Sequence, residues 1–388
     1  MDIYPNYGRV QRLRVAQGLT QAELADRLNL PASALSRVLS GQAPLDVTGA
    51  GRLAAALACN VDLLSKPVAD TLYTRPWLRA YADAPKKAVE QYVADTLLAF
   101  ESFTALGLRR IPERLPAFSG DLNDEAAIDE FAAEVRMAAD VATADCVPNV
   151  TRAAERLGCV VLPMDSELGR HLGMSLFVDG TPIIRVGRPS SGNGIPGDRQ
   201  RFTVAHELGH VTLHAESPPP DNADEAREIE KQAHRFAGAF LLPGDSFLAD
   251  LDAAGGRVTL ATLSKLKRRW GVAIKAMVVR LQQLHRIDAD HARSLYKQIS
   301  ARGWNKLEPE VVGNERAIWL QKALSQRFLD SPEAVAQVAG RTGLHDTYFG
   351  SWTNWEAAPD ATIIPFNSQS NRRGAARPAN LHRDVTEL

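Results

Sequence analysis

His206, Glu207 and His210 form the pattern H-E-x-x-H, whose residue types and spacing can bind a metal ion and activate a water molecule. The surrounding segment, 199–214, has no proline, and its apolar residues are spaced as in a buried or half-buried helix. Residues i and i+4 of a helix share one face, so both imidazoles could bind one ion. A zinc ion with three protein ligands keeps a fourth position for water and lowers the pKa of that water toward about 7. Glu207 would then act as the general base.

A third metal ligand has to come from another element. Residues 224–242 predict a second helix, acidic in its first turns and ended by a proline and a glycine. Glu230 lies beside the apolar face of this helix, and a carboxylate completes known catalytic two-His zinc sites. His234, one turn further on, could orient a ligand from behind, and it is also an alternative third ligand, after Glu230. For His214 we expect a structural role.

Each of these interpretations has a plain alternative. The H-E-x-x-H helix could carry two histidines by chance, one of them capped or half-buried, because the pattern is short. His234 could equally be a surface or helix-packing histidine. The two segments taken together separate these alternatives better than either segment does alone.

The two segments resemble a known family. The sequence R-x-R-F-T-V-A-H-E-L-G-H-x-x-L-H, followed by I-E-K-Q-A-H-R-F-A-G-A-F-L-L-P, is similar to the ImmA/IrrE family of zinc metallopeptidases over about residues 150–250. The resemblance implies a gluzincin-like domain with Zn²⁺ as cofactor. By position, it implies the zinc ligands His206, His210 and Glu230, with Glu207 as general base. Many family members have Asn or Asp at the position of His234, so the resemblance does not supply a role for that residue.

Residues 6–66 carry the signals of five short helices. Thr20 and Glu23 have the spacing of a capping box, which predicts a helix that begins there and continues through Leu28. A proline then leads into a predicted helix over 32–39. The segment G-L-T-Q-A-E-L-A-D-R-L-N-L-P-A-S-A-L-S-R-V-L-S-G resembles the helix-turn-helix of repressors of the xenobiotic-response-element type.

That resemblance implies DNA binding, with the second helix of the motif in the major groove. Gln21 would contact phosphate at a helix start, and Arg37 would reach phosphate or guanine. Ser33 and Ser36 would face base edges or phosphates. Ala32 and Ala34 occupy positions where many relatives carry longer polar side chains, so a helical bundle kept for protein contacts is the alternative.

The remaining patterns set the fold class. Helical periodicity predicts helices over 86–108, 125–142 and 147–157, and strand signals follow at 159–163, 173–178 and 181–186. We therefore predict a mainly α fold with a small β-sheet (α+β). The predicted domains are a five-helix helix-turn-helix domain (1–66), a helical linker or scaffold (67–150), an ImmA/IrrE-like zinc metallopeptidase domain (151–287), a helical C-terminal region (288–356) and a disordered tail (357–388).

Composition constrains the partners and the location. The formal net charge is −1, so any nucleic-acid binding must be local. The sequence contains no run of eighteen apolar residues and no basic-then-apolar start, which predicts a cytoplasmic protein without a membrane partner. The cysteines Cys59, Cys146 and Cys159 are odd in number and unpaired in spacing, as expected of reduced thiols.

These observations favour a DNA-binding regulator that carries a zinc-dependent endopeptidase. As the family resemblance implies, it would cleave a partner protein such as a repressor or antitoxin in a stress or toxin–antitoxin response. The alternative is a transcriptional regulator or antitoxin whose peptidase-like domain senses or binds a partner with little or no proteolysis. A third interpretation is a housekeeping peptidase that uses its N-terminus only for dimerisation. A homodimer is compatible with all three.

Overall fold

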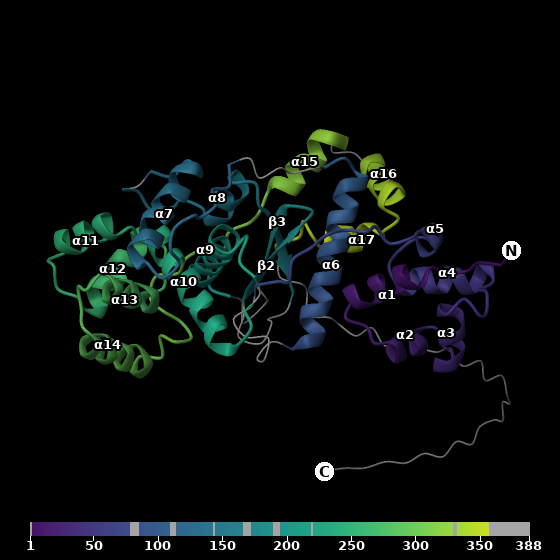
Figure 1. Ribbon diagram of the computed structural model, residues 1–388, viewed down its shortest axis with the longest axis horizontal. Coiled ribbons are helices and arrows are strands. Elements are labelled where there is room, and N and C mark those ends of the chain that lie inside the picture. Colours follow the sequence, from purple (N-terminus) through teal and green to yellow (C-terminus); the bar gives the residue numbers. More distant parts are fainter. Residues whose placement is uncertain are drawn as a thin grey trace, which may run out of the picture.

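The computed structural model describes residues 2–77, 85–108, 114–142, 144–165, 172–188, 195–218, 220–328 and 332–356. It is mainly helical with one three-stranded mixed sheet, which confirms the predicted α+β class (Figure 1). The N-terminal elements are α1 (Tyr7–Ala16), α2 (Gln21–Arg27), α3 (Ala32–Leu39), α4 (Val47–Ala56), α5 (Val61–Ser65) and α6 (Lys86–Ala105). The central elements are α7 (Glu125–Ala138), α8 (Val150–Arg156), β1 (Val160–Met164), β2 (Gly173–Val178), β3 (Thr181–Gly187), α9 (Gly197–Leu213) and α10 (Ala223–Leu241).

The C-terminal part is helical, as predicted. It consists of α11 (Gly244–Ala253), α12 (Leu260–Trp270), α13 (Ile274–Gln283), α14 (Ala289–Ala301), α15 (Trp319–Phe328), α16 (Pro332–Thr342) and α17 (Asp346–Gly350). The predicted tail, 357–388, lies outside the described residues. No helix among the described residues is long and apolar enough to cross a membrane.

The two helices of the predicted helix-turn-helix, α2 and α3, form where the sequence places them. The hydroxyl of Thr20 accepts a hydrogen bond from Glu23 N at 3.1 Å, and the Glu23 carboxylate accepts one from Thr20 N at 2.6 Å. This reciprocal pair is the predicted capping box, and it satisfies two amide groups that have no partner within the helix. Asn29 adopts a positive φ of 52° and turns the chain from α2 toward α3. The result is the α2–turn–α3 unit of a helix-turn-helix.

The sheet has the strand order β1-β3-β2. β1 runs parallel to β3, with Val160 opposite Ile183, whereas β2 and β3 form an antiparallel hairpin. The hairpin turns at Asp179 and Gly180, whose φ values are 45° and 75°. Two positive φ values match the right-handed twist of the strands that they connect. The strands predicted over 173–178 and 181–186 are therefore confirmed, and the two residues between them form the turn of a hairpin.

The two faces of the sheet are buried in different cores. Successive strand residues point to opposite faces. Ile183 accordingly lies in a core shared with the helix-turn-helix, α6 and the C-terminal helices, whereas Ile184 lies in a core with helices α7 to α14. Figure 1 shows α6 standing between the N-terminal helices and the sheet. The region 67–150 is thus divided between the cores, with α6 on the helix-turn-helix side and α7 on the other.

A short segment before α6 extends the sheet at β2. Residues 72–77, called the edge segment below, pair antiparallel with the outer side of β2. Thr74 N donates to Phe177 O at 3.0 Å, Trp77 N donates to Ser175 O at 2.9 Å, and Phe177 N donates to Thr74 Oγ1 at 3.0 Å. The chain between the helix-turn-helix and α6 therefore runs beside the sheet strand that contacts α9.

One buried carboxylate connects the C-terminal helices to this sheet. Asp95 of α6 pairs with Arg185 of β3, with 2.7 Å between Oδ2 and Nη2. The same carboxylate accepts hydrogen bonds from Tyr348 Oη at 2.7 Å and from Trp352 Nε1 at 3.0 Å. Burial and the Asp95 carboxylate raise the pKa of Tyr348 well above its usual range. Asp95 thus joins α6, β3 and the α17 region in one polar cluster.

Candidate metal centre

Helix α9 carries the H-E-x-x-H residues through the middle of the larger core. Its apolar side, including Val204, Leu208 and Val211, is fully or almost fully buried. His206 and His210 lie one turn apart on the same face, as their i, i+4 spacing predicts, with 3.1 Å between their Nε2 atoms. His210 is buried, and His206 is half-buried.

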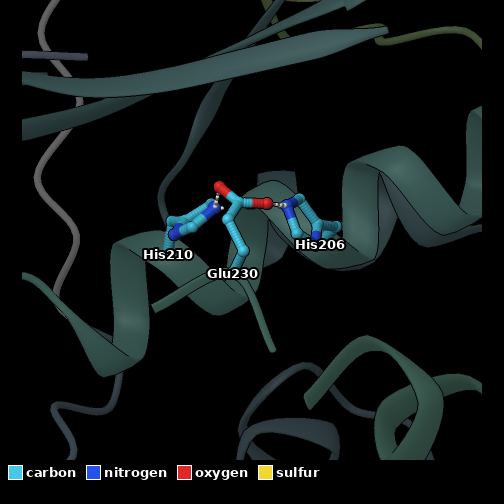
Figure 2. A group of neighbouring side chains, drawn as sticks. All are labelled: His206, His210 and Glu230. Carbon is cyan, nitrogen blue, oxygen red and sulfur yellow. Dashed lines mark hydrogen bonds and ion pairs between the residues drawn. The ribbon is translucent and has the colours of Figure 1, made fainter. Parts of the chain in front are cut away.

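Helix α10 brings Glu230 to this face. The glutamate lies between the two imidazoles (Figure 2), with Oε2 at 3.2 Å from His206 Nε2 and Oε1 at 3.3 Å from His210 Nε2. The close approach of the helices depends on Gly209, because a Cβ there would lie 3.0 Å from the Phe236 ring. A residue without a side chain therefore allows α10 to bring its carboxylate over the two histidines.

The three side chains fit a zinc ion. One donor atom from each of His206, His210 and Glu230 lies within 4.8 Å of the others. A tetrahedral zinc about 2.1 Å from each ligand atom would hold those atoms about 3.4 Å apart. The observed separations of 3.1, 3.2 and 3.3 Å are close to that value. Two imidazoles and one carboxylate are also the donor set of known catalytic zinc sites with an open position for water.

Glu207 lies beside this group and is held by the sheet. Ser175 Oγ of β2 donates a hydrogen bond to Glu207 Oε2 at 2.7 Å. Burial raises the pKa of Glu207 to about 7, against the opposing effects of His206 and Ser175. Gly173 allows this contact between β2 and α9, since a Cβ there would lie 2.6 Å from Thr203 Cγ2 and 3.2 Å from Glu207 Cγ. A carboxyl group with this pKa can both take up and release a proton near neutral pH.

His214 contacts a metal-ligand candidate directly. Its Nδ1 lies 3.2 Å from His210 Nδ1, and its Nε2 lies 3.0 Å from Gln232 Oε1. Because an amide oxygen only accepts, Nε2 of His214 carries the proton and Nδ1 accepts from His210. Burial and the nearby His210 lower the pKa of His214 to about 3, which keeps it neutral. With a metal ion bound, this chain of contacts would direct the lone pair of His210 Nε2 to the ion.

The pKa of Glu230 is lowered well below its usual range. Burial alone would raise it, but the hydrogen bonds and positive charge offered by His206 and His210 outweigh that effect. Glu230 is therefore ionised at neutral pH, which is the form in which a carboxylate binds a cation.

His234 lies next to the group but is not part of it. Its ring is edge-on to that of His206, with 5.1 Å between centroids, and it also contacts Phe202 at 5.0 Å. The side chain is exposed, whereas the three candidate ligands are buried or half-buried. The donor atoms that converge come from His206, His210 and Glu230. A role for His234 in orienting His206 stays a prediction.

Trp77 is a residue of this site that sequence analysis missed. Its ring stacks on His210 with 5.9 Å between centroids and an interplanar angle of 6°, and it touches His214 at 5.6 Å. It comes from the edge segment, 129 positions before His206 (206 minus 77). The segment has no periodicity or motif that would place it at a metal centre.

The candidate ligands open into a large cleft of about 1170 Å³. Trp77, Glu207 and the three candidate ligands lie at one part of its wall. The other parts of the wall come from α9, α10, α13 and α14 and from residues that follow α14. They include Arg199, Phe202, Lys275, Ala276, Val279, Ile299, Trp304 and Asn305. This mixture of apolar and polar groups beside a candidate metal centre is typical of a substrate-binding cleft.

The predicted DNA-contacting residues lie together on the helix-turn-helix. Ser33, Ser36 and Arg37 are exposed on α3, on the side opposite its buried Leu35 and Leu39. Gln21 begins α2 and is half-buried. The structure thus leaves three of the four side chains accessible on the helix that would enter a major groove. Contact of these residues with DNA stays a prediction.

Comparison with known protein families agrees with both halves of this description. Residues 10–64 match the family described as helix-turn-helix. Residues 154–282 match the family described as IrrE N-terminal-like domain, of the M78 peptidases, which are typically zinc-dependent. No curated protein matches the chain. The first match runs from within α1 to near the end of α5. The second contains all of β1 to α12 and most of α13, and so includes His206, His210, Glu207 and Glu230. The chain therefore combines an N-terminal helix-turn-helix domain with an IrrE N-terminal-like, metallopeptidase-like domain.

Proposed function

We propose that this protein is a cytoplasmic DNA-binding regulator whose IrrE-like domain is a zinc-dependent endopeptidase acting on a partner protein, such as a repressor or antitoxin. The observation that carries the proposal is the convergence of His206, His210 and Glu230 beside a buried Glu207. A purely structural zinc site is usually closed by four protein ligands. The three-ligand set found here supports a site with a position left for water.

The residues of this site divide the work of peptide hydrolysis. His206, His210 and Glu230 would hold Zn²⁺, which when bound supplies an acidified water and polarises the substrate carbonyl. Ser175 orients the carboxylate of Glu207 through the hydrogen bond to Oε2. Glu207 would take the proton from the attacking water and return it to the leaving amine. The burial that raises the pKa of Glu207 favours proton uptake by its carboxylate.

The cleft supports a polypeptide substrate. Its volume of about 1170 Å³ exceeds the upper range of ordinary small-molecule pockets, about 1000 Å³. Apolar side chains such as Phe202 and Trp304 can contact apolar residues of a substrate, while Arg199 and Lys275 add positive charge to the wall. A segment of a partner protein would supply several side chains to such a surface.

The helix-turn-helix would bring the peptidase to an operator. Arg37, Ser33 and Ser36 are exposed on α3, which supports docking of that helix in the major groove. Operators for such domains are often palindromic, so a homodimer on DNA is part of the proposal. The net charge of −1 supports binding through this local surface only.

The test compares the wild type with Glu207→Gln, which keeps the size of the side chain and removes the base. New protein N-termini are identified by mass spectrometry in cells that express either form under stress. We expect a small set of cleavage products that the wild type generates and Glu207→Gln does not. Glu216→Gln, an exchange at an exposed glutamate close to α9, is the control and should cleave normally. Identical N-termini with Glu207→Gln and with the wild type would contradict the proposal.

A second function is favoured by one observation. The edge segment pairs with the outer side of β2, and Trp77 covers His210, so the protein's own chain occupies part of the surface near the metal site. This supports a regulator whose peptidase-like domain binds a partner with little turnover. Regulation that persists in Glu207→Gln and is lost in Arg37→Ala would favour that function over proteolysis.

A further inference from the structure

The plane of the His210 ring is confined by two different contacts. The hydrogen bond between His210 Nδ1 and His214 Nδ1 determines which nitrogen carries the proton. It does not prevent the ring from tilting about that bond. The near-parallel stacking of Trp77, at 6° and 5.9 Å, limits the tilt from the side.

Trp77 is itself held firmly. Its side chain is 9% exposed, and its backbone amide donates to Ser175 O at 2.9 Å. Ser175 also donates to Glu207, so the same residue of β2 fixes both Trp77 and the proposed general base. The indole Nε1 has no hydrogen-bond partner among the described residues. The ring is therefore fixed by stacking and by its backbone.

We propose that Trp77 is a positioning residue of the zinc site, which sets the orientation of His210 and makes zinc affinity depend on the edge segment. This inference rests on the zinc site of the proposed function. Trp77 lies outside residues 154–282, the part that matches the IrrE N-terminal-like family. A residue from the segment that follows the helix-turn-helix thus packs directly on a candidate metal ligand.

A tryptophan that only fills space in the core needs nothing more than apolar neighbours to pack against. Trp270 is an example, since it is 1% exposed, packs on Phe247 and donates from Nε1 to Asp250. Trp77 instead contacts two histidines, one of them a candidate ligand. Substitution of either tryptophan removes packing, but only substitution of Trp77 also removes a contact that orients a candidate ligand. Trp270 is therefore the matched control.

The first experiment measures zinc affinity of the full chain by competition with a chelator. Trp77→Leu keeps apolar volume and removes the stacked plane, so we expect roughly tenfold weaker zinc binding, the lower end of the effect of removing a group that orients a ligand. Trp77→Phe keeps a ring and should restore most of the affinity. Trp270→Phe should lower the melting temperature and leave zinc affinity unchanged.

A second variant perturbs the edge segment at a distance from the metal. Thr74→Val keeps the shape of the side chain but removes the acceptor for Phe177 N. If the edge segment holds Trp77 in place, Thr74→Val should weaken zinc binding by a smaller factor than Trp77→Leu. Co²⁺ in place of zinc gives a second readout, because a reoriented His210 should change the visible absorption bands of the bound Co²⁺. We expect this spectral change to be largest in Trp77→Leu, smaller in Trp77→Phe and smallest in Thr74→Val.

The outcomes separate this inference from the proposed function. Wild-type zinc affinity and an unchanged cobalt spectrum in folded Trp77→Leu would overturn the positioning role, even if the protein cleaves a substrate. If Trp77→Leu does not fold, the same two measurements on Thr74→Val decide the question, and wild-type zinc affinity with an unchanged cobalt spectrum in that variant would overturn the positioning role. Weakened zinc binding in Trp77→Leu or Thr74→Val, together with no proteolysis by the wild type, would support the positioning role and contradict the peptidase.

Discussion

His210 and His214 face each other through their Nδ1 atoms, which lie 3.2 Å apart in the core of the metallopeptidase-like domain. Gln232 contacts the other nitrogen of His214 at 3.0 Å, which fixes the direction of both hydrogen bonds. His210 Nε2 would therefore present its lone pair to a metal ion bound beside Glu230, without any rearrangement of the ring.

The first prediction concerns this relay. His214→Phe keeps a buried ring but removes the acceptor for His210, so we expect zinc affinity to fall about 10- to 100-fold. The measurement is competition with a chelator in the full chain. His291→Phe, at an exposed histidine of α14, is the control and should bind zinc as the wild type does. Equal affinities in all three proteins would mean that His214 only fills space.

The second prediction concerns DNA. Arg37→Ala removes an exposed cation from α3 and should weaken binding to the protein's own promoter DNA by about 1–3 kcal/mol. If Arg37 contacts phosphate, the dependence of log affinity on log salt should also become less steep by about one unit. Fluorescence anisotropy over a range of salt concentrations measures both quantities.

Arg293→Ala is the matched control for Arg37→Ala. Arg293 is also exposed, but it lies on α14 and pairs with Asp290. It should bind the promoter fragment with wild-type affinity. No salt-dependent binding by the wild type, or full binding by Arg37→Ala, would favour a helical bundle used for protein contacts.

The third prediction concerns the polar cluster around Asp95. Asp95→Ala leaves Arg185 buried without its partner and removes the acceptor for Tyr348 and Trp352. Breaking a buried ion pair in this way should lower the free energy of unfolding by about 3 to 5 kcal/mol. Denaturant unfolding measures the loss. Asp290→Ala, at an exposed ion pair, should change stability little, and equal stability of both variants would contradict the role of Asp95.

Much of the site could be predicted because helical spacing is local. The i, i+4 rule places His206 and His210 on one face, and the capping box at Thr20 and Glu23 is visible in four residues. Glu230 could be predicted as a candidate by its residue type and by the family resemblance. Its position between the imidazoles depends on the close packing of two helices at Gly209.

The contribution of Trp77 could not be predicted from the sequence. It arises from pairing of the edge segment with β2, and such pairing depends on tertiary structure rather than on local pattern. The relay through His214 was missed for a related reason. The expected structural role is consistent with its burial, but its contact with Gln232 joins two helices and cannot be seen in α9 alone.

The measurement that tests the central claim most directly is the zinc content of the purified protein and of Glu230→Ala, determined side by side by elemental analysis. Glu228→Ala is the matched control, because Glu228 lies on the same helix with its side chain 47% exposed and pairs with Lys231. We predict about one zinc per chain in the wild type and in Glu228→Ala, and a clear loss in Glu230→Ala. A well-folded wild type without zinc, or undiminished zinc in Glu230→Ala, would contradict the three-ligand site.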